Sequence, residues 1–154
     1  AETGAVIVCF QRLNTLKRAV SNYRMTEERK SQFRRKDLSP SRIPPEYLKS
    51  QIERYEVYNA QRRCLMEMAA RAGVDVMEIR YEDIQTRPHT LFLEFFDKVG
   101  LPPDECLEEH SQSSRFKKST GDDLREVLIN YDEIHSYFTG TPVLAMLEER
   151  RSVQ

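Results

Sequence analysis

An arginine that follows an apolar segment, and a serine nine residues later, are the first residues whose types and spacing suit chemistry. Residues 5–10 are continuously apolar, Arg12 follows them after one polar residue, Gln11, and Ser21 lies in the helical pattern that comes next. In a helix, Asn14, Arg18 and Ser21 share one face because they are four and then three residues apart. Guanidinium and hydroxyl groups are suitable donors to phosphate. The pattern therefore indicates a phosphate site, although arginine and serine also occur together on ordinary solvated helices.

A second segment places a tyrosine directly after a predicted strand. Tyr81 follows the strand predicted at 74–80 and precedes two acids, Glu82 and Asp83. The ring and hydroxyl group of a tyrosine suit contact with a base or a phosphate, and the acids suit bracing of the next loop. A tyrosine that only packs beside an acidic turn explains the same residues equally well. A helix that starts at Pro88 and stops at residues 100–102, Gly-Leu-Pro, is expected next.

A third segment is a basic loop that leads into a helix start. Arg115, Lys117 and Lys118 precede residues 120–123, Thr-Gly-Asp-Asp, which resemble a capped helix N-terminus. Cations beside the N–H groups of a helix start form an anion site. Lys117 and Lys118 are equal candidates for an anion ligand, and a solvated basic loop is the alternative interpretation.

The order of these three segments resembles the second half of the sulfotransferases, the enzymes that transfer a sulfuryl group from 3′-phosphoadenosine 5′-phosphosulfate (PAPS) to an acceptor hydroxyl. The bacterial and carbohydrate sulfotransferases are the most similar, because they carry a comparable late segment. The resemblance implies that Arg12 and Ser21 hold the 3′-phosphate of the donor and that Tyr81 lies at the nucleotide. It further implies that Lys117 or Lys118 closes over the 3′-phosphate and adenine. It assigns no catalytic residue.

The resemblance covers only half of the family's pattern. The family's first strand and loop, which grip the 5′-phosphosulfate, and the base that deprotonates the acceptor precede the matched segments. Nothing before Ala5 suits a phosphate loop. We therefore expect PAPS, or its product adenosine 3′,5′-bisphosphate, to be the ligand, and a missing N-terminal segment or a second chain to supply the rest. We expect the chain alone to be inactive. The acceptor would be a carbohydrate or a lipid-like molecule, and the sequence does not identify it.

Two other functions compete with the transferase. The family usually places the arginine eight residues before the serine, and that position is Leu13 here, so a non-enzymatic interaction module with a degenerate sulfotransferase fold is the first alternative. Nucleic-acid binding is the second, because residues 1–43 hold ten basic and four acidic side chains, a formal charge of +6. We expect no nucleic-acid partner, since the whole chain has a net charge of −1 and aromatic residues are not interleaved with the basic ones.

Most other enzyme signatures are missing. The five glycines are too far apart for a glycine-rich phosphate loop, and the three histidines lie more than twenty residues apart, so we expect no metal. The cysteines are scattered, which argues against a disulfide framework. They are Cys9, Cys64 and Cys106, and we expect the first two to be buried free thiols.

The elements that must position these residues are two strands, each followed by helices. The expected order is a strand at 5–10, a helix at 15–33, a helix at 46–71, a strand at 74–80, a helix at 88–99, a helix at 124–138 and a last short helix at 143–149. A short helix near 104–109 is also expected. On the long second helix, Tyr58, Leu65 and Met68 continue an apolar stripe that we expect to pack in the core.

This order predicts an α/β fold with a single domain over residues 1–154. Two strands make a poor core by themselves. We therefore expect a helix-rich part of a P-loop-like parallel sheet with flanking helices, from which the N-terminal strand and phosphate-loop unit is missing. No window of 18 apolar residues predicts a membrane segment and no signal peptide is visible, so a cytoplasmic location is favoured.

Overall fold

The computed structural model describes residues 4–27, 39–102 and 123–149, which form two compact units. The first unit contains residues 4–13 and 56–102. The second contains residues 14–27, 39–55 and 123–149. Lys117, Lys118 and the short helix expected near 104–109 lie outside the described residues.

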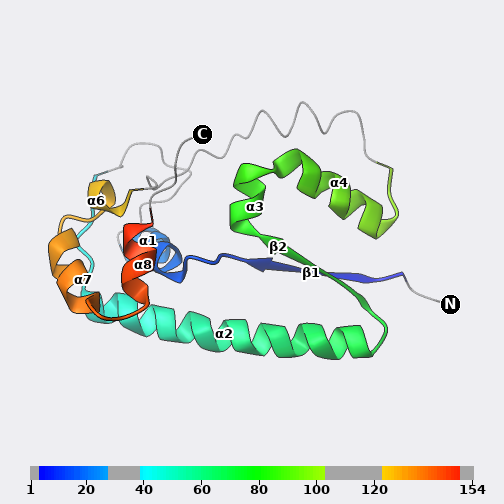
Figure 1. Ribbon diagram of the computed structural model, residues 1–154, viewed down its shortest axis with the longest axis horizontal. Coiled ribbons are helices and arrows are strands. Elements are labelled where there is room, and N and C mark those ends of the chain that lie inside the picture. The colour runs from blue at the N-terminus through cyan, green and yellow to red at the C-terminus, as the bar shows by residue number, and fades with distance from the viewer. Residues whose placement is uncertain (1–3, 28–38, 103–122, 150–154) are drawn as a thin grey trace. The chain divides into compact units, whose positions relative to one another are not determined.

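The first unit is built on a small parallel sheet. Strand β1, Val6–Gln11, pairs with β2, Asp75–Arg80, in a register that runs from Val6 opposite Asp75 to Gln11 opposite Arg80 (Figure 1). The described residues contain only these two strands. The predicted α/β class with a parallel sheet is therefore confirmed.

Two helices follow β2 in the same unit. Helix α3, Tyr81–Thr86, begins directly at the end of the strand, so the turn expected there is wrong. Glu82 and Asp83 lie in its first turn, where the helix dipole favours negative charge, and this explains the extra helix. Helix α4, Pro88–Val99, starts at the predicted proline and ends at Gly100, whose φ of 69° is left-handed.

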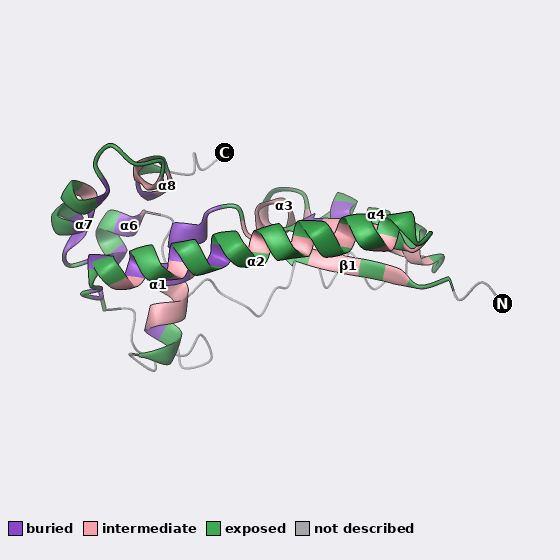
Figure 2. Ribbon diagram, turned by 90° about the horizontal axis from the view of Figure 1, so that it is seen from below, coloured by how far each residue is buried: buried purple, intermediate pink, exposed green. Residues whose placement is uncertain are grey.

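The long helix α2, Pro45–Arg71, contributes to both units. Its first part buries Leu48, Ile52 and Tyr55 in the second unit. Its later part is mostly exposed (Figure 2), and the expected core packing of its apolar stripe there is wrong. The exposed fractions are 43% for Tyr58, 64% for Leu65 and 60% for Met68. The period of an apolar stripe does not determine whether another element covers it, and among its described residues the first unit buries only Ile79 and Leu91.

The second unit holds the hydrophobic core. Helices α1, Thr15–Thr26, α6, Leu124–Val127, α7, Tyr131–Phe138, and α8, Val143–Glu148, pack with the first part of α2. Helix α1 starts where predicted and ends at Thr26, while residues 28–33 of its expected length lie outside the described residues. The core includes Leu16, Val20, Ile43, Leu48, Leu124, Ile134 and Phe138.

The helix predicted over 124–138 is divided into α6 and α7. The break falls at Leu128, which forms an isolated parallel bridge with Ser41. The Ser41 amide donates to the Val127 carbonyl at 2.8 Å, and the Ile129 amide donates to the Ser41 carbonyl at 3.0 Å. These bonds take backbone groups that a continuous helix would use for itself, so the single helix is wrong although its apolar residues are buried as expected.

The cysteine prediction is correct only in part. Cys9 and Cys64 are both free thiols, as expected. Cys9 is half-buried and Cys64 is exposed, so the prediction that both are buried is wrong. Among the described residues, no three His, Cys, Asp or Glu side chains are grouped so that they could hold a metal ion. Across the same part of the chain, every helix is too short or too polar to cross a membrane.

Candidate functional site

The carboxyl ends of β1 and β2 bring two of the predicted site residues together. The strand register ends with Gln11 opposite Arg80. Arg12 is therefore the first residue after β1, and Tyr81 is the first residue after β2. The Arg12 guanidinium carbon lies 4.6 Å from the centroid of the Tyr81 ring. Ligands of open α/β sheets bind outside the carboxyl ends of the strands. The two residues that the sequence selected separately therefore meet where such a ligand is expected.

One residue further along, the two segments are joined by a carboxylate. The Leu13 amide donates to both Glu82 oxygens at 3.2 Å. Asp83 pairs with Arg87 across one helical turn at 3.6 Å. Glu82 therefore holds the segment that follows Arg12, and Asp83 makes an ion pair with the residue that caps the C-terminal end of α3, whereas the loop that the acids were expected to brace is a helix.

The stack of Arg12 on Tyr81 combines two kinds of recognition. A guanidinium group uses its face in such a stack, while its N–H donors lie in the plane of the group. Both side chains are half-buried, so neither is a purely solvent-exposed contact. A planar cation beside an aromatic ring suits a ligand that carries a phosphate next to an aromatic base.

The sequence did not reveal Arg62, which holds the end of β1. From α2, its guanidinium donates to the Phe10 carbonyl at 3.1 Å and to the Gln11 side chain. It also lies 3.8 Å from the Glu78 carboxylate on β2. The contacts to β1 span about fifty positions of sequence, so no local pattern indicated them.

The structure does not place the remaining predicted site residues in the same unit as Arg12 and Tyr81. Ser21 is half-buried in α1, which belongs to the second unit, and Lys117 and Lys118 lie outside the described residues. The other two polar residues of the expected α1 face have local partners. Arg18 lies 4.1 Å from the centroid of the Tyr55 ring, and Asn14 caps α1 by accepting from the Lys17 amide at 2.8 Å.

Part of the basic N-terminal region is used inside the second unit. Lys17 is 7% exposed and donates to the Glu149 carbonyl at 2.9 Å. Arg24 is 4% exposed and donates to the Ser39 carbonyl at 3.3 Å. These two cations are buried, so they neither belong to a solvated helical face nor donate to a ligand at the surface. They do not support nucleic-acid binding.

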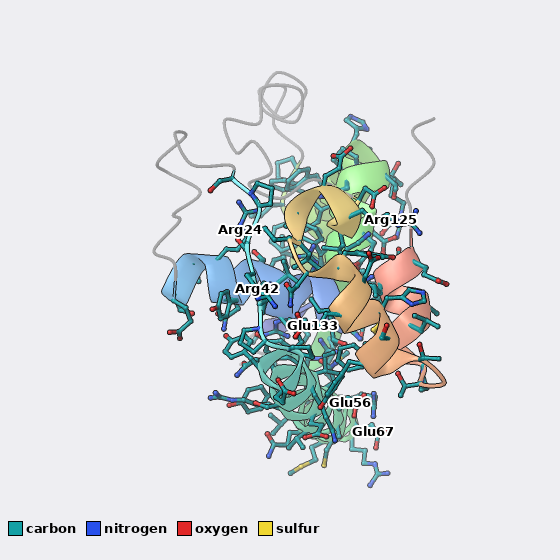
Figure 3. All side chains as sticks on the ribbon, turned by 90° about the vertical axis from the view of Figure 1, so that its left-hand side faces the viewer. Arg24, Arg42, Glu56, Glu67, Arg125 and Glu133 are labelled. Carbon is teal, nitrogen blue, oxygen red and sulfur yellow. The ribbon has the colours of Figure 1, made fainter. Side chains whose placement is uncertain are left out.

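The second unit also has a cavity of about 700 Å³ beside α6 and α7. Its lining includes Arg42, which pairs with Glu133 at 2.9 Å (Figure 3), and Arg125, which lies 5.1 Å from the centroid of the Tyr131 ring. A hydrogen bond and the charge of Tyr131 raise the pKa of Arg125. Both arginines therefore have partners on the protein, and the cavity is mixed in charge rather than a basic site.

No family model, curated protein or solved structure matches this chain.

Proposed function

We propose that this chain binds the 3′-phosphate and adenine side of PAPS, or of adenosine 3′,5′-bisphosphate, as part of a sulfotransferase. The observation that supports the proposal is the stack of Arg12 on Tyr81 at the carboxyl ends of two parallel strands. Arg12 would donate in-plane N–H groups to the 3′-phosphate, and the Tyr81 ring would lie at the nucleotide base. Ser21, Lys117 and Lys118 would add donors from the other segments.

In this proposal the chain binds the donor and does not activate the acceptor. Sulfuryl transfer needs a base that takes the acceptor proton and positive groups that neutralise the oxygens of the leaving phosphate. Arg12 would hold the far end of the nucleotide and so fix its orientation for in-line attack. The base and the site for the 5′-phosphosulfate would come from another segment or another chain.

Calorimetric titration with adenosine 3′,5′-bisphosphate tests the binding role. We expect the folded chain to bind, and Arg12→Gln and Ser21→Ala to weaken binding. Arg71→Gln and Ser50→Ala, which change exposed residues of α2, serve as controls. A concentration of about one hundred times the dissociation constant should stabilise the fold by about 2.7 kcal/mol. Absence of binding by the folded chain would refute the donor site.

A non-enzymatic interaction module is the second candidate, and exposed apolar side chains favour it. Phe10 on β1 is 67% exposed, and Leu65 and Met68 on α2 are exposed to a similar degree. Exposed apolar side chains that form one contiguous patch are typical of a surface that another protein covers. Incubation of the full-length gene product with PAPS and hydroxylated acceptors separates the candidates. Sulfuryl transfer supports the enzyme, whereas no transfer and no nucleotide binding support the module.

A further inference from the structure

We propose that Arg62 is a positioning residue for the donor site, because it fixes the end of β1 from which Arg12 emerges. This inference rests on the proposed function of Arg12 and Tyr81. Arg62 itself contacts neither of these two residues in any interaction described above. Its effect on a nucleotide would therefore pass through the backbone and side chains that it holds.

The contacts of Arg62 converge on the two residues that precede Arg12. One guanidinium nitrogen donates to the Phe10 carbonyl at 3.1 Å, and the other donates to the Gln11 side-chain oxygen. The Arg62 side chain is 17% exposed; its bond to Gln11 is partly buried, whereas its bond to the Phe10 carbonyl lies at the surface. Hydrogen bonds from a charged donor are stronger than those between neutral groups. The last two residues of β1 are thus tied to α2.

The same side chain also reaches the neighbouring strand. Arg62 lies 3.8 Å from Glu78, and the Glu78 carboxylate accepts from Arg80 at 3.3 Å. Arg80 directly precedes Tyr81. One connected group of charges, formed by Arg62, Glu78 and Arg80, therefore ends beside both partners of the Arg12–Tyr81 stack. It sets the two strand ends relative to each other at the point where the stack begins.

The role requires the shape of arginine. A planar fork can serve a carbonyl, an amide oxygen and a carboxylate at once, whereas a lysine ammonium group is a single point charge. Without the fork, the Phe10 carbonyl and the Gln11 side chain lose their charged donor, and the end of β1 is less restrained. We then expect Arg12 to bind the 3′-phosphate in a less favourable geometry, while contacts to the rest of the nucleotide persist.

The test measures selectivity rather than stability alone. Dissociation constants for adenosine 3′,5′-bisphosphate and adenosine 5′-monophosphate are compared in the full chain, in Arg62→Met and in Gln11→Ala. We expect both variants to lose about tenfold in their preference for the bisphosphate. Arg63→Met, which removes an exposed arginine at the next position of α2, should leave that preference unchanged. Arg62→Lys should restore only part of it.

A second measurement reports on the stack directly. In chain labelled with ¹³C-tyrosine, the Tyr81 ring signals, assigned with Tyr81→Phe, should shift in Arg62→Met and stay in place in Arg63→Met. If the wild-type chain prefers the bisphosphate, and a folded Arg62→Met variant has the same preference, the positioning role of Arg62 is refuted and the proposed function is not. A wild-type chain with no preference for the bisphosphate would overturn the proposed function and this inference together. Gln11→Ala leaves Arg62 in place. If Arg62→Met does not fold, the preference of Gln11→Ala for the bisphosphate tests the positioning role instead.

Discussion

Among the residues that the structure describes, three guanidinium groups lie over tyrosine rings. The pairs are Arg12 with Tyr81 at 4.6 Å, Arg18 with Tyr55 at 4.1 Å and Arg125 with Tyr131 at 5.1 Å. An arginine held in this way has fewer conformations to lose when its N–H groups bind a partner. Of the three, only the first lies at the end of the parallel sheet, and this position distinguishes it as a ligand candidate.

The stack at Tyr55 leads to a prediction about pH. Burial raises the pKa of Tyr55 above its ordinary value of 10.0, and the charge of Arg18 opposes the rise. The folded state thus holds the phenol proton more tightly than the unfolded chain does. Its stabilising effect is complete below the unfolded pKa and is lost as the pH rises through the folded pKa.

We therefore expect the free energy of unfolding to fall as the pH rises through about 10 and above, and to fall less steeply in Tyr55→Phe. Urea denaturation at several pH values measures both slopes. The comparison between the two proteins removes the contribution of the other tyrosines. Parallel slopes would show that the fold does not shift the Tyr55 pKa.

At the scale of elements, Asn14 both caps α1 and ties it to the end of the chain. Its side-chain oxygen accepts from the Lys17 amide at 2.8 Å, and its amide nitrogen donates to the Met146 carbonyl at 2.8 Å and to the Glu149 carboxylate. Asn14→Ser should keep the cap and lose the two bonds of the amide nitrogen, at a cost of about 1–2 kcal/mol. Asn14→Ala should lose all three, at a cost of about 2–3 kcal/mol. Chemical denaturation measures the difference, and equal losses in the two variants would show that the cap contributes nothing.

Element ends were predictable wherever a local residue determines them. Asn14 at the start of α1, Pro88 at the start of α4 and Gly100 at its end each act within one helical turn. The break at Leu128 was not predictable, because its partner Ser41 is 87 positions away in the chain. The apolar period of residues 124–138 is the same for one helix or two, so only the tertiary contact decides between them.

The candidate site shows the same limit. Arg12 and Tyr81 were identifiable because each follows a predicted strand, and parallel pairing then brings them together. Arg62 was not identifiable, because its role depends on which face of α2 lies near β1. Exposure of Leu65 and Met68 was equally hidden, since a stripe of apolar residues does not reveal whether anything covers it.

At the scale of the whole molecule, buried apolar residues are divided unequally between the two units. In the part of the chain that the structure describes, the sheet-containing unit buries only Ile79 and Leu91 among apolar side chains. The other unit holds a continuous core in which Leu16, Ile43 and Ile134 are fully buried. Because local stability follows buried apolar contacts, the two units should open with different free energies.

Amide hydrogen exchange tests this inequality along the chain. We expect amides in β1, β2 and α4 to exchange about 100-fold faster than those in α1 and in the first part of α2, because opening the sheet exposes little apolar surface. Addition of adenosine 3′,5′-bisphosphate should slow exchange at the carboxyl ends of the strands, since a ligand that binds only the closed state stabilises it. Uniform protection of strands and helices in the free chain would contradict the inequality. It would mean that hydrogen bonds and charge pairs, such as that of Arg62 with Glu78, stabilise the sheet as strongly as the core stabilises the helices.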